Sequence, residues 1–103
     1  MSWAAHAKSL LREGKTATVK PRGNSMRPII FDGDTVTLDP IKDPDTLRKG
    51  TVVLCRVNGR DYLHLIKAIK HPGPRFQIAN RKGRVNGWVG TNSIFGIVAD
   101  VER

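Results

Sequence analysis

The sequence has few features that could cross-link the chain or anchor it in a membrane. Cys55 is the only cysteine among 103 residues, so no internal disulfide can form, and a reducing, cytoplasmic location is expected. No apolar run approaches the roughly 20 residues of a transmembrane helix, and the first residues lack the apolar core of a signal peptide. The sequence therefore predicts neither a disulfide scaffold nor a membrane partner.

Acidic and aromatic residues are also scarce. Nine Asp and Glu stand against 18 Lys and Arg, for a formal net charge of +9, and only 6% of the residues are aromatic. A basic excess favours polyanionic partners, above all nucleic acid. However, no basic helix and no basic stretch interleaved with aromatics is present, so a merely solvated basic surface is the alternative. Both readings stay open at this point.

The length predicts one domain, residues 1–103, with an N-terminal helix over 1–14 and a β domain over 15–103. Ser2 can cap the helix, and Gly14 suits its C-terminal end. Apolar side chains recur at helical spacing, namely Trp3, Ala4, Ala7, Leu10 and Leu11.

Strand-like segments make up most of the remaining sequence. Residues 51–57 and 61–69 are separated by Asn58-Gly59, the preferred pair for a two-residue hairpin turn. That turn sets a register in which Val57 faces Arg60, Leu54 faces Leu63, and Gly50 faces Lys67. Further strands are expected at 16–20, 35–38, 75–79 and 93–101. Gly and Asn predict a loop at 80–92, and Pro and charged residues predict a connection at 39–49.

Two polar residues occupy positions that suit catalysis. The hairpin register places Lys67 on an apolar row with Leu63 and Leu65, and burial penalises the charged form of a lysine. A neutral lysine can act as a general base, although a lysine whose amine reaches water is the simpler reading. Ser25 lies in a loop between Gly23 and Pro28, where free backbone amides can stabilise an oxyanion. An ordinary turn serine is again the alternative.

The histidines and the cysteine receive structural readings. His64 falls on the other face of the hairpin, with Val53 and Ile66, and is expected to be structural or partly exposed. His6 and His71 show no metal-ligand spacing with any Cys or acid, so no metal site is predicted. No cofactor is expected either. Cys55 is interpreted as a small core residue.

Several segments, taken in order, resemble the Ser/Lys peptidase domain shared by LexA-type repressors and type I signal peptidases. Residues 23–28 (GNSMRP) and 32–36 (DGDTV) are similar to the Ser-Met nucleophile box and the strand after it. Residues 47–53 (LRKGTVV), 65–69 (LIKAI) and 94–98 (IFGIV) resemble later strands. The resemblance spans about residues 17–101. It implies a mainly β fold, a coiled and partly open barrel-like peptidase domain with one short N-terminal helix.

The resemblance also implies roles for individual residues. Ser25 matches the nucleophile, and Lys67 matches the general base. The Ser25 amide would form part of an oxyanion hole, and Met26 would line the adjacent pocket. Gly23 stands where some signal peptidases place an additional oxyanion serine. The sequence departs from the family at 79–88. Ala79 breaks the Gly-Asp-Asn-Arg box of signal peptidases, and residues 85–88 (VNGW) replace the Asp-Ser-Arg part of the pattern.

Three functions are compatible with these features. The leading hypothesis is a serine peptidase with a Ser/Lys dyad that cleaves a peptide bond in another chain. Self-cleavage is not expected, because the residues before Ser25 are predicted to be helical or paired in a sheet. The second hypothesis is a catalytically inactive basic module of the same fold that binds nucleic acid or a protein partner. The third is a peptide-binding subunit that adds a partner strand to its sheet edge. A homodimer is compatible with all three.

Overall fold

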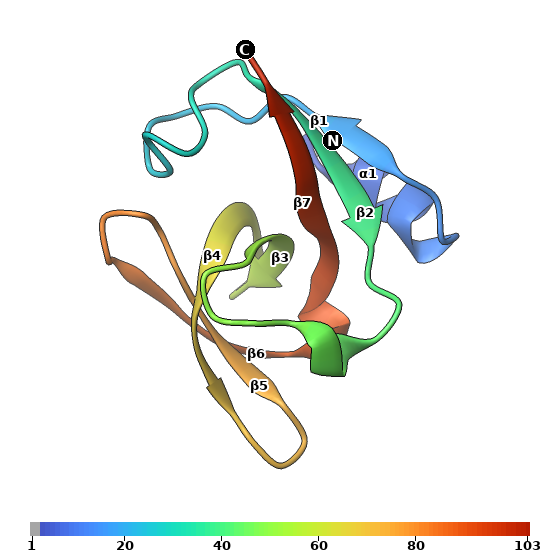
Figure 1. Cartoon of the computed structure of the whole chain (residues 1–103), viewed down its shortest axis with the longest axis vertical. Coiled ribbons are helices and arrows are strands. Elements are labelled where there is room, and N and C mark those ends of the chain that lie inside the picture. Colours follow the sequence, from blue (N-terminus) through green and yellow to red (C-terminus); the bar gives the residue numbers. More distant parts are fainter. Residues whose placement is uncertain (1–2) are drawn as a thin grey trace.

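The computed structural model describes residues 3–103 and consists of one curled antiparallel sheet with a helix packed against one end (Figure 1). The sheet has seven strands in the order β1-β2-β7-β3-β4-β5-β6. The elements are α1 (Ala5–Arg12), β1 (Ala17–Val19), β2 (Thr35–Pro40), η1 (Pro44–Thr46), β3 (Val52–Val57), β4 (Arg60–Lys70), β5 (Arg75–Ala79), β6 (Val85–Gly90), η2 (Thr91–Ser93) and β7 (Ile94–Glu102). This half-barrel confirms the predicted mainly β, partly open barrel-like class.

The β3–β4 hairpin has the register that Asn58-Gly59 predicts. Leu54 pairs with Leu63, and Val57 pairs with Arg60. Both turn residues adopt left-handed backbone angles, with φ of 49° at Asn58 and 81° at Gly59, as a type I′ turn requires. The regular register ends at Val52 opposite Leu65.

Helix α1 is shorter than the predicted 1–14, and it starts after the expected cap. Ser2 lies outside the described residues, and Ala4 occupies the N-cap position without a side-chain hydrogen bond. At the other end Gly14 has a φ of 78°. Its N–H donates to Leu11 O, and the N–H of Lys15 donates to Leu10 O. These two bonds are those of a Schellman motif, which is why a glycine ends the helix.

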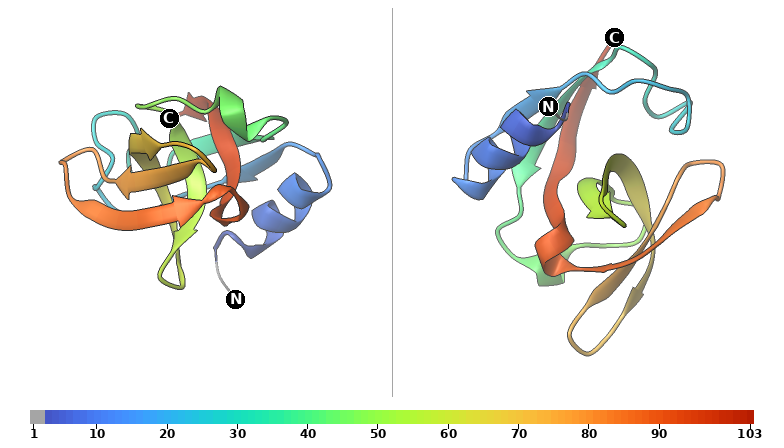
Figure 2. Two further views of the ribbon diagram at one scale, coloured as in Figure 1. Left: turned by 90° about the horizontal axis from the view of Figure 1, so that it is seen from below. Right: turned by 180° about the vertical axis from the view of Figure 1, so that it is seen from behind.

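Alternate residues of the central strands feed two apolar clusters. Leu54 and Leu63 join the cluster beneath α1, whereas Val53, Cys55 and Ile66 join the cluster on the other side of the sheet. Successive side chains of a strand point to opposite faces, so the curled sheet has a packed layer on each side. The views from below and behind show α1 covering the β1, β2 and β7 end only (Figure 2).

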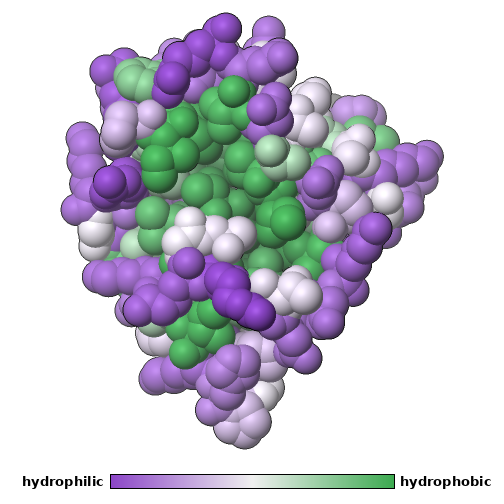
Figure 3. Space-filling view, in the orientation of Figure 1, coloured by the Kyte–Doolittle hydropathy of each residue, from purple (hydrophilic) through white to green (hydrophobic). Residues whose placement is uncertain are grey.

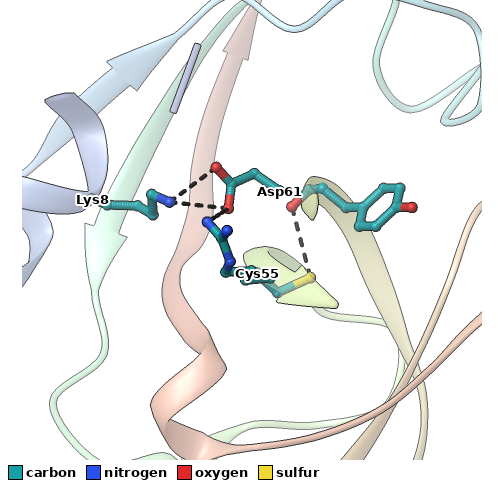
Figure 4. A network of polar contacts seen from close by, with 5 residues as sticks. Lys8, Cys55 and Asp61 are labelled. Atoms are coloured by element: carbon teal, nitrogen blue, oxygen red, sulfur yellow. Dashed lines mark hydrogen bonds and ion pairs between the residues drawn. The ribbon is translucent and has the colours of Figure 1, made fainter. Parts of the chain in front are cut away.

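A buried ion pair fastens the helix to the hairpin (Figure 4). Lys8 Nζ of α1 lies 2.9 and 3.0 Å from the two carboxylate oxygens of Asp61 in β4. Arg56 approaches the same carboxylate at 3.6 Å. Beside this network, burial and then the negative charge of Asp61 raise the pKa of the Cys55 thiol to about 12. Cys55 is therefore an inert core residue rather than a nucleophile.

Residues 80–92 differ from the predicted loop, because β6 runs through them. Asn and Gly have low strand propensity, but the backbone of β6 pairs with β5, with Phe76 opposite Val89. The turn before it is closed by Asn80, whose carbonyl accepts from Gly83 N and whose Oδ1 accepts from Arg84 N. Cross-strand pairing thus decides the structure here against local composition.

Within residues 3–103, no helix has the length and apolar character to cross a bilayer.

Candidate functional site

Ser25 lies in the long loop between β1 and β2, and this loop is fixed at several points. The Ser25 carbonyl accepts from the N–H of Arg81 at 3.1 Å, which ties the loop to the β5–β6 turn. Gly23 N–H donates to Asp32 Oδ1 at 2.6 Å, and Gly23 has a φ of 99°, a conformation that glycine adopts without strain. Ser25 therefore occupies a defined position although it lies outside any helix or strand.

Two apolar side chains anchor the loop to the core from within. Met26 and Ile30 are 4% and 3% exposed, and both belong to the cluster beneath α1. The carbonyl of Met26 accepts from Ile29 N and Ile30 N. Asp34 closes the loop by accepting from Phe31 N at 2.8 Å. The loop is thus anchored by two buried apolar side chains, whereas Gly23, Pro28 and Gly33 are exposed.

His64 is the side chain beside Ser25. Its Nε2 lies 3.1 Å from Ser25 Oγ. The imidazole is buried, with 7% of the residue exposed, and it stacks on Tyr62 with ring centroids 4.8 Å apart. A serine hydroxyl within hydrogen-bond range of an imidazole nitrogen is the arrangement of an activated nucleophile and its base.

Asn86 completes a line of three polar side chains. Its Oδ1 lies 2.7 Å from His64 Nδ1. An amide oxygen accepts only, so Nδ1 carries the proton and Nε2 is left to accept from the Ser25 hydroxyl. The Ser25–His64–Asn86 contacts hold the imidazole in the tautomer that a general base requires.

The sheet brings His64 and Asn86 together although β5 separates their strands. β5 ends at Ala79, which pairs with Leu65, so no strand continues between the positions of His64 and Asn86. In addition, Ile78 pairs with Gly87 and Ala79 with Val85. Asn86 is thus the extra residue of a β-bulge, a feature that re-aims side chains beside functional sites.

Burial shifts His64 toward the neutral form. Desolvation is the main cause and lowers the pKa of His64 below 6.5, and the hydrogen bond to Asn86 opposes it in part. A histidine with a lowered pKa is unprotonated at neutral pH. It is then able to accept a proton from Ser25.

A cleft of about 590 Å³ opens over these residues. Its polar floor contains Ser25, His64 and Asn86, and its apolar wall contains Met26, Ile30 and Leu63. Separately, the face of the molecule that is seen in Figure 1 has an apolar, hollowed area bordered by hydrophilic residues (Figure 3). The cleft is large enough for several side chains of a peptide.

The structure does not bring Lys67 to Ser25. Lys67 is exposed and does not line the cleft, and its side chain has no hydrogen bond or ion pair with any of residues 3–103. The predicted pairing with Gly50 is wrong, because Gly50 N–H donates to Ile66 O instead. On the other side Ile66 pairs with Ile78 and Ala68 with Gln77, so Lys67 is the extra residue of a bulge. Regular alternation, on which its placement in the apolar row rested, fails at this residue.

Sequence reasoning missed two members of the site, His64 and Asn86. The hairpin register assigned His64 to the correct face, but nothing local to the hairpin indicates that the loop of Ser25 covers that face. Asn86 was missed because residues 80–92 are predicted to be a loop, whereas β6 runs through them. The signal available for it was the turn from Asn80 to Gly83, which typically precedes a returning strand. Gly23, Ser25 and Met26, to which the resemblance assigns roles, all line the cleft.

The sequence profile described as Peptidase S24-like matches residues 3–91. The chain belongs to the Peptidase S24-like family. The matched region contains every residue of the cleft floor and both strands that carry His64 and Asn86. No curated protein matches the chain.

Proposed function

We propose that this S24-like domain is a serine peptidase in which Ser25 is the nucleophile, His64 the general base and Asn86 the residue that orients His64. The observation that carries the proposal is the contact of 3.1 Å between Ser25 Oγ and His64 Nε2, continued at 2.7 Å from His64 Nδ1 to Asn86 Oδ1. Lys67, the base that the resemblance implied, has no place in this line.

The chemistry follows from these contacts. Ser25 Oγ attacks the carbonyl carbon of a peptide bond while its proton passes to His64 Nε2. The tetrahedral intermediate collapses to a serine ester, and the leaving amine takes the proton from His64. Water then attacks the ester, His64 accepts a proton from it, and return of that proton to Ser25 releases the carboxylic product. Asn86 orients the imidazole through its hydrogen bond to Nδ1, and because it is neutral it stabilises protonated His64 less than a carboxylate would.

The oxyanion would be bound by the loop that carries the nucleophile. The Ser25 N–H donates no hydrogen bond within residues 3–103, so it is available to a developing negative charge. The N–H of Gly23 is taken by Asp32. In this proposal Met26 supplies apolar surface beside the nucleophile, and Gly23 shapes the backbone rather than donating to the oxyanion.

The substrate would be a peptide bond in another chain. The residues before Ser25 are held in the fold: Ala7 and Leu11 of α1 are 3% and 4% exposed, and β1 pairs with β2 through Thr18 opposite Thr37. Placing this segment extended across Ser25 would break its packing and hydrogen bonds. The purified chain should therefore keep its full mass.

A fluorophosphonate probe tests the proposal, because it modifies serines that a base activates. We expect labelling of the 103-residue chain at Ser25, identified by peptide mass spectrometry, and no labelling of Ser25→Ala. Ser93, which is outside the cleft, is the internal control. Labelling of both serines at the same slow rate would contradict an activated nucleophile.

One observation favours a second candidate function, the inactive basic module. The formal net charge of +9 suits a polyanion, and such binding falls steeply with salt. A salt-dependent shift of duplex DNA, retained in Ser25→Ala and accompanied by no fluorophosphonate labelling, would favour this candidate over the peptidase.

A further inference from the structure

The residues that line the cleft include several basic side chains. Four line it, and they come from separate parts of the sequence, namely Lys20, Arg22, Arg60 and Arg84. Lys20 and Arg22 belong to the segment between β1 and β2, Arg60 begins β4, and Arg84 immediately precedes β6. The fold therefore gathers these charges around Ser25, although they are scattered along the chain.

Within residues 3–103, the fold uses none of these four cations. All four residues are exposed, and none of their side chains has a hydrogen bond, ion pair or aromatic contact with residues 3–103. Other basic residues are used: Lys8 pairs with Asp61, and Arg103 lies over Phe31 at 4.1 Å. The charges at the cleft are thus free to bind a ligand.

Acidic residues do not offset these charges. Among the described residues that line the cleft, Asp61 is the only carboxylate. Its side chain is 4% exposed and lies within ion-pair distance of both Lys8 and Arg56. A substrate in the cleft would therefore meet four exposed positive charges and one carboxylate that is already neutralised.

We propose that the cleft selects acidic polypeptide segments, with Asp or Glu on both sides of the bond presented to Ser25. This proposal rests on the peptidase function above and adds the class of substrate. Arg22 and Arg84 would bind substrate carboxylates that flank the Ser25–His64 pair. Lys20 and Arg60 would bind carboxylates further along the substrate peptide. Exposed charge pairs are individually weak, so selection comes from several acting together.

The lining favours a peptide over a nucleic acid. Met26, Ile30 and Leu63 form an apolar wall beside Ser25, which suits an aliphatic side chain next to the scissile bond. Nucleic acid in a groove is held by bases stacked on aromatic side chains. Of the two Trp and Tyr residues that line the cleft, Tyr62 is already stacked on His64, which leaves only the exposed Trp3 for a base.

Fluorescence anisotropy with the Ser25→Ala chain tests the proposal, since that variant leaves peptides uncut. The probes are three labelled peptides of equal length with a central Leu-Ala pair flanked by Glu, by Gln or by Lys. We expect the Glu peptide to bind about tenfold more tightly than the Gln peptide at low salt, and the difference to shrink near physiological salt.

Matched double variants locate the effect. Arg22→Gln/Arg84→Gln removes two charges from the cleft, and Lys42→Gln/Lys49→Gln removes two exposed charges elsewhere. We expect about a fivefold to tenfold loss of Glu-peptide affinity in the first and less than a twofold change in the second. Circular dichroism checks that both variants are folded. If one of them does not fold, the salt dependence of Glu-peptide binding to the Ser25→Ala chain still tests the proposal.

Three results would overturn the proposal. They are equal affinity for the Glu and Gln peptides, equal losses in both double variants, and displacement of the Glu peptide by an oligothymidylate at lower concentration than by unlabelled Glu peptide. Fluorophosphonate labelling of Ser25 is scored separately in the unsubstituted chain. Selective Glu-peptide binding without labelling would reject the peptidase and keep the cleft as an acidic-peptide site. Labelling without selective binding would keep the peptidase and reject the acidic-peptide site.

Discussion

Strand β4 pairs differently along its two halves. From Arg60 to Leu65 it pairs with β3 without interruption. From Leu65 to Lys70 it pairs with β5 across a bulge at Lys67. His64 lies in the regular half and is buried against Ser25, whereas Lys67 is the bulged residue and is exposed. Two side chains suited to act as a base, three positions apart, thus have opposite environments because one strand changes its partner between them.

The comparison shows where alternation can be trusted. Side chains of a paired strand alternate between faces as long as each residue has a partner. Lys67 has none in either register, so counting by twos from Leu63 and Leu65 does not place it. A β-bulge has the opposite consequence in β6. There the bulged residue is Asn86, and its side chain contacts His64 instead of being exposed like Lys67.

The largest expected effect separates the two halves of β4 directly. His64→Gln should lower the rates of fluorophosphonate labelling and peptide hydrolysis about 10³-fold or more, because general-base catalysis is lost. Lys67→Gln should change them less than about threefold. The rates are measured as initial velocities at neutral pH.

His71→Gln is the matched control, since His71 is exposed and outside the cleft. It should behave like the unsubstituted chain. If Lys67→Gln instead lost as much activity as His64→Gln, the lysine would have a catalytic role, and the assignment of the base to His64 would be wrong.

Asn86 offers an intermediate effect. Asn86→Ala removes the acceptor on Nδ1, so His64 can adopt the wrong tautomer or rotate, and hydrolysis should slow about 10- to 100-fold. Asn86→Asp keeps an acceptor and adds a negative charge that favours protonated His64. This variant should retain activity and move the acid limb of its pH profile to higher pH. A merely structural Asn86 would leave that limb unmoved.

The pH profile distinguishes the two candidate bases without a substitution. Protonated His64 cannot accept a proton from Ser25, so activity should fall about tenfold per pH unit below the His64 pKa. Burial lowers that pKa from 6.5, so the midpoint of the fall lies below pH 6.5 and activity is full at neutral pH. An ordinary lysine loses its proton only near pH 10. A rate that keeps rising through pH 8 and 9 would therefore point to a lysine.

The sequence predicted the parts of this molecule that depend on neighbouring residues. Asn58-Gly59 fixed one hairpin and its register, and Gly14 marked the end of α1. Ser25 followed from the resemblance of the segment around it. The pairing of Ser25 with His64 depends on a loop and a strand that are distant in sequence, and Asn86 depends on where β5 ends. Those features follow from which strands meet, and local propensity does not contain that information.

A smaller effect tests the hairpin turn that precedes the regular half of β4. Gly59 has a φ of 81°, and a Cβ placed there meets nothing within 4 Å, so Gly59→Ala carries only backbone strain. It should lower the free energy of unfolding by about 1 kcal/mol in urea titration. Gly90→Ala is the control, since its φ is −87° and its Cβ site is also open. Equal effects of the two substitutions would show that the turn is not of the left-handed type.

The smallest expected effect belongs to Lys67 itself. Its side chain is exposed and has no polar partner within residues 3–103, so Lys67→Ala should change the free energy of unfolding by less than about 0.5 kcal/mol. Alternation predicts instead a lysine buried in a regular strand. Removing a buried charge changes the free energy of unfolding by more than about 1 kcal/mol, in either direction. Urea titration with unchanged m-value measures the difference. A near-zero value supports the bulge, whereas a shift of about 2 kcal/mol would restore the regular strand and place Lys67 back in the apolar row with Leu63 and Leu65.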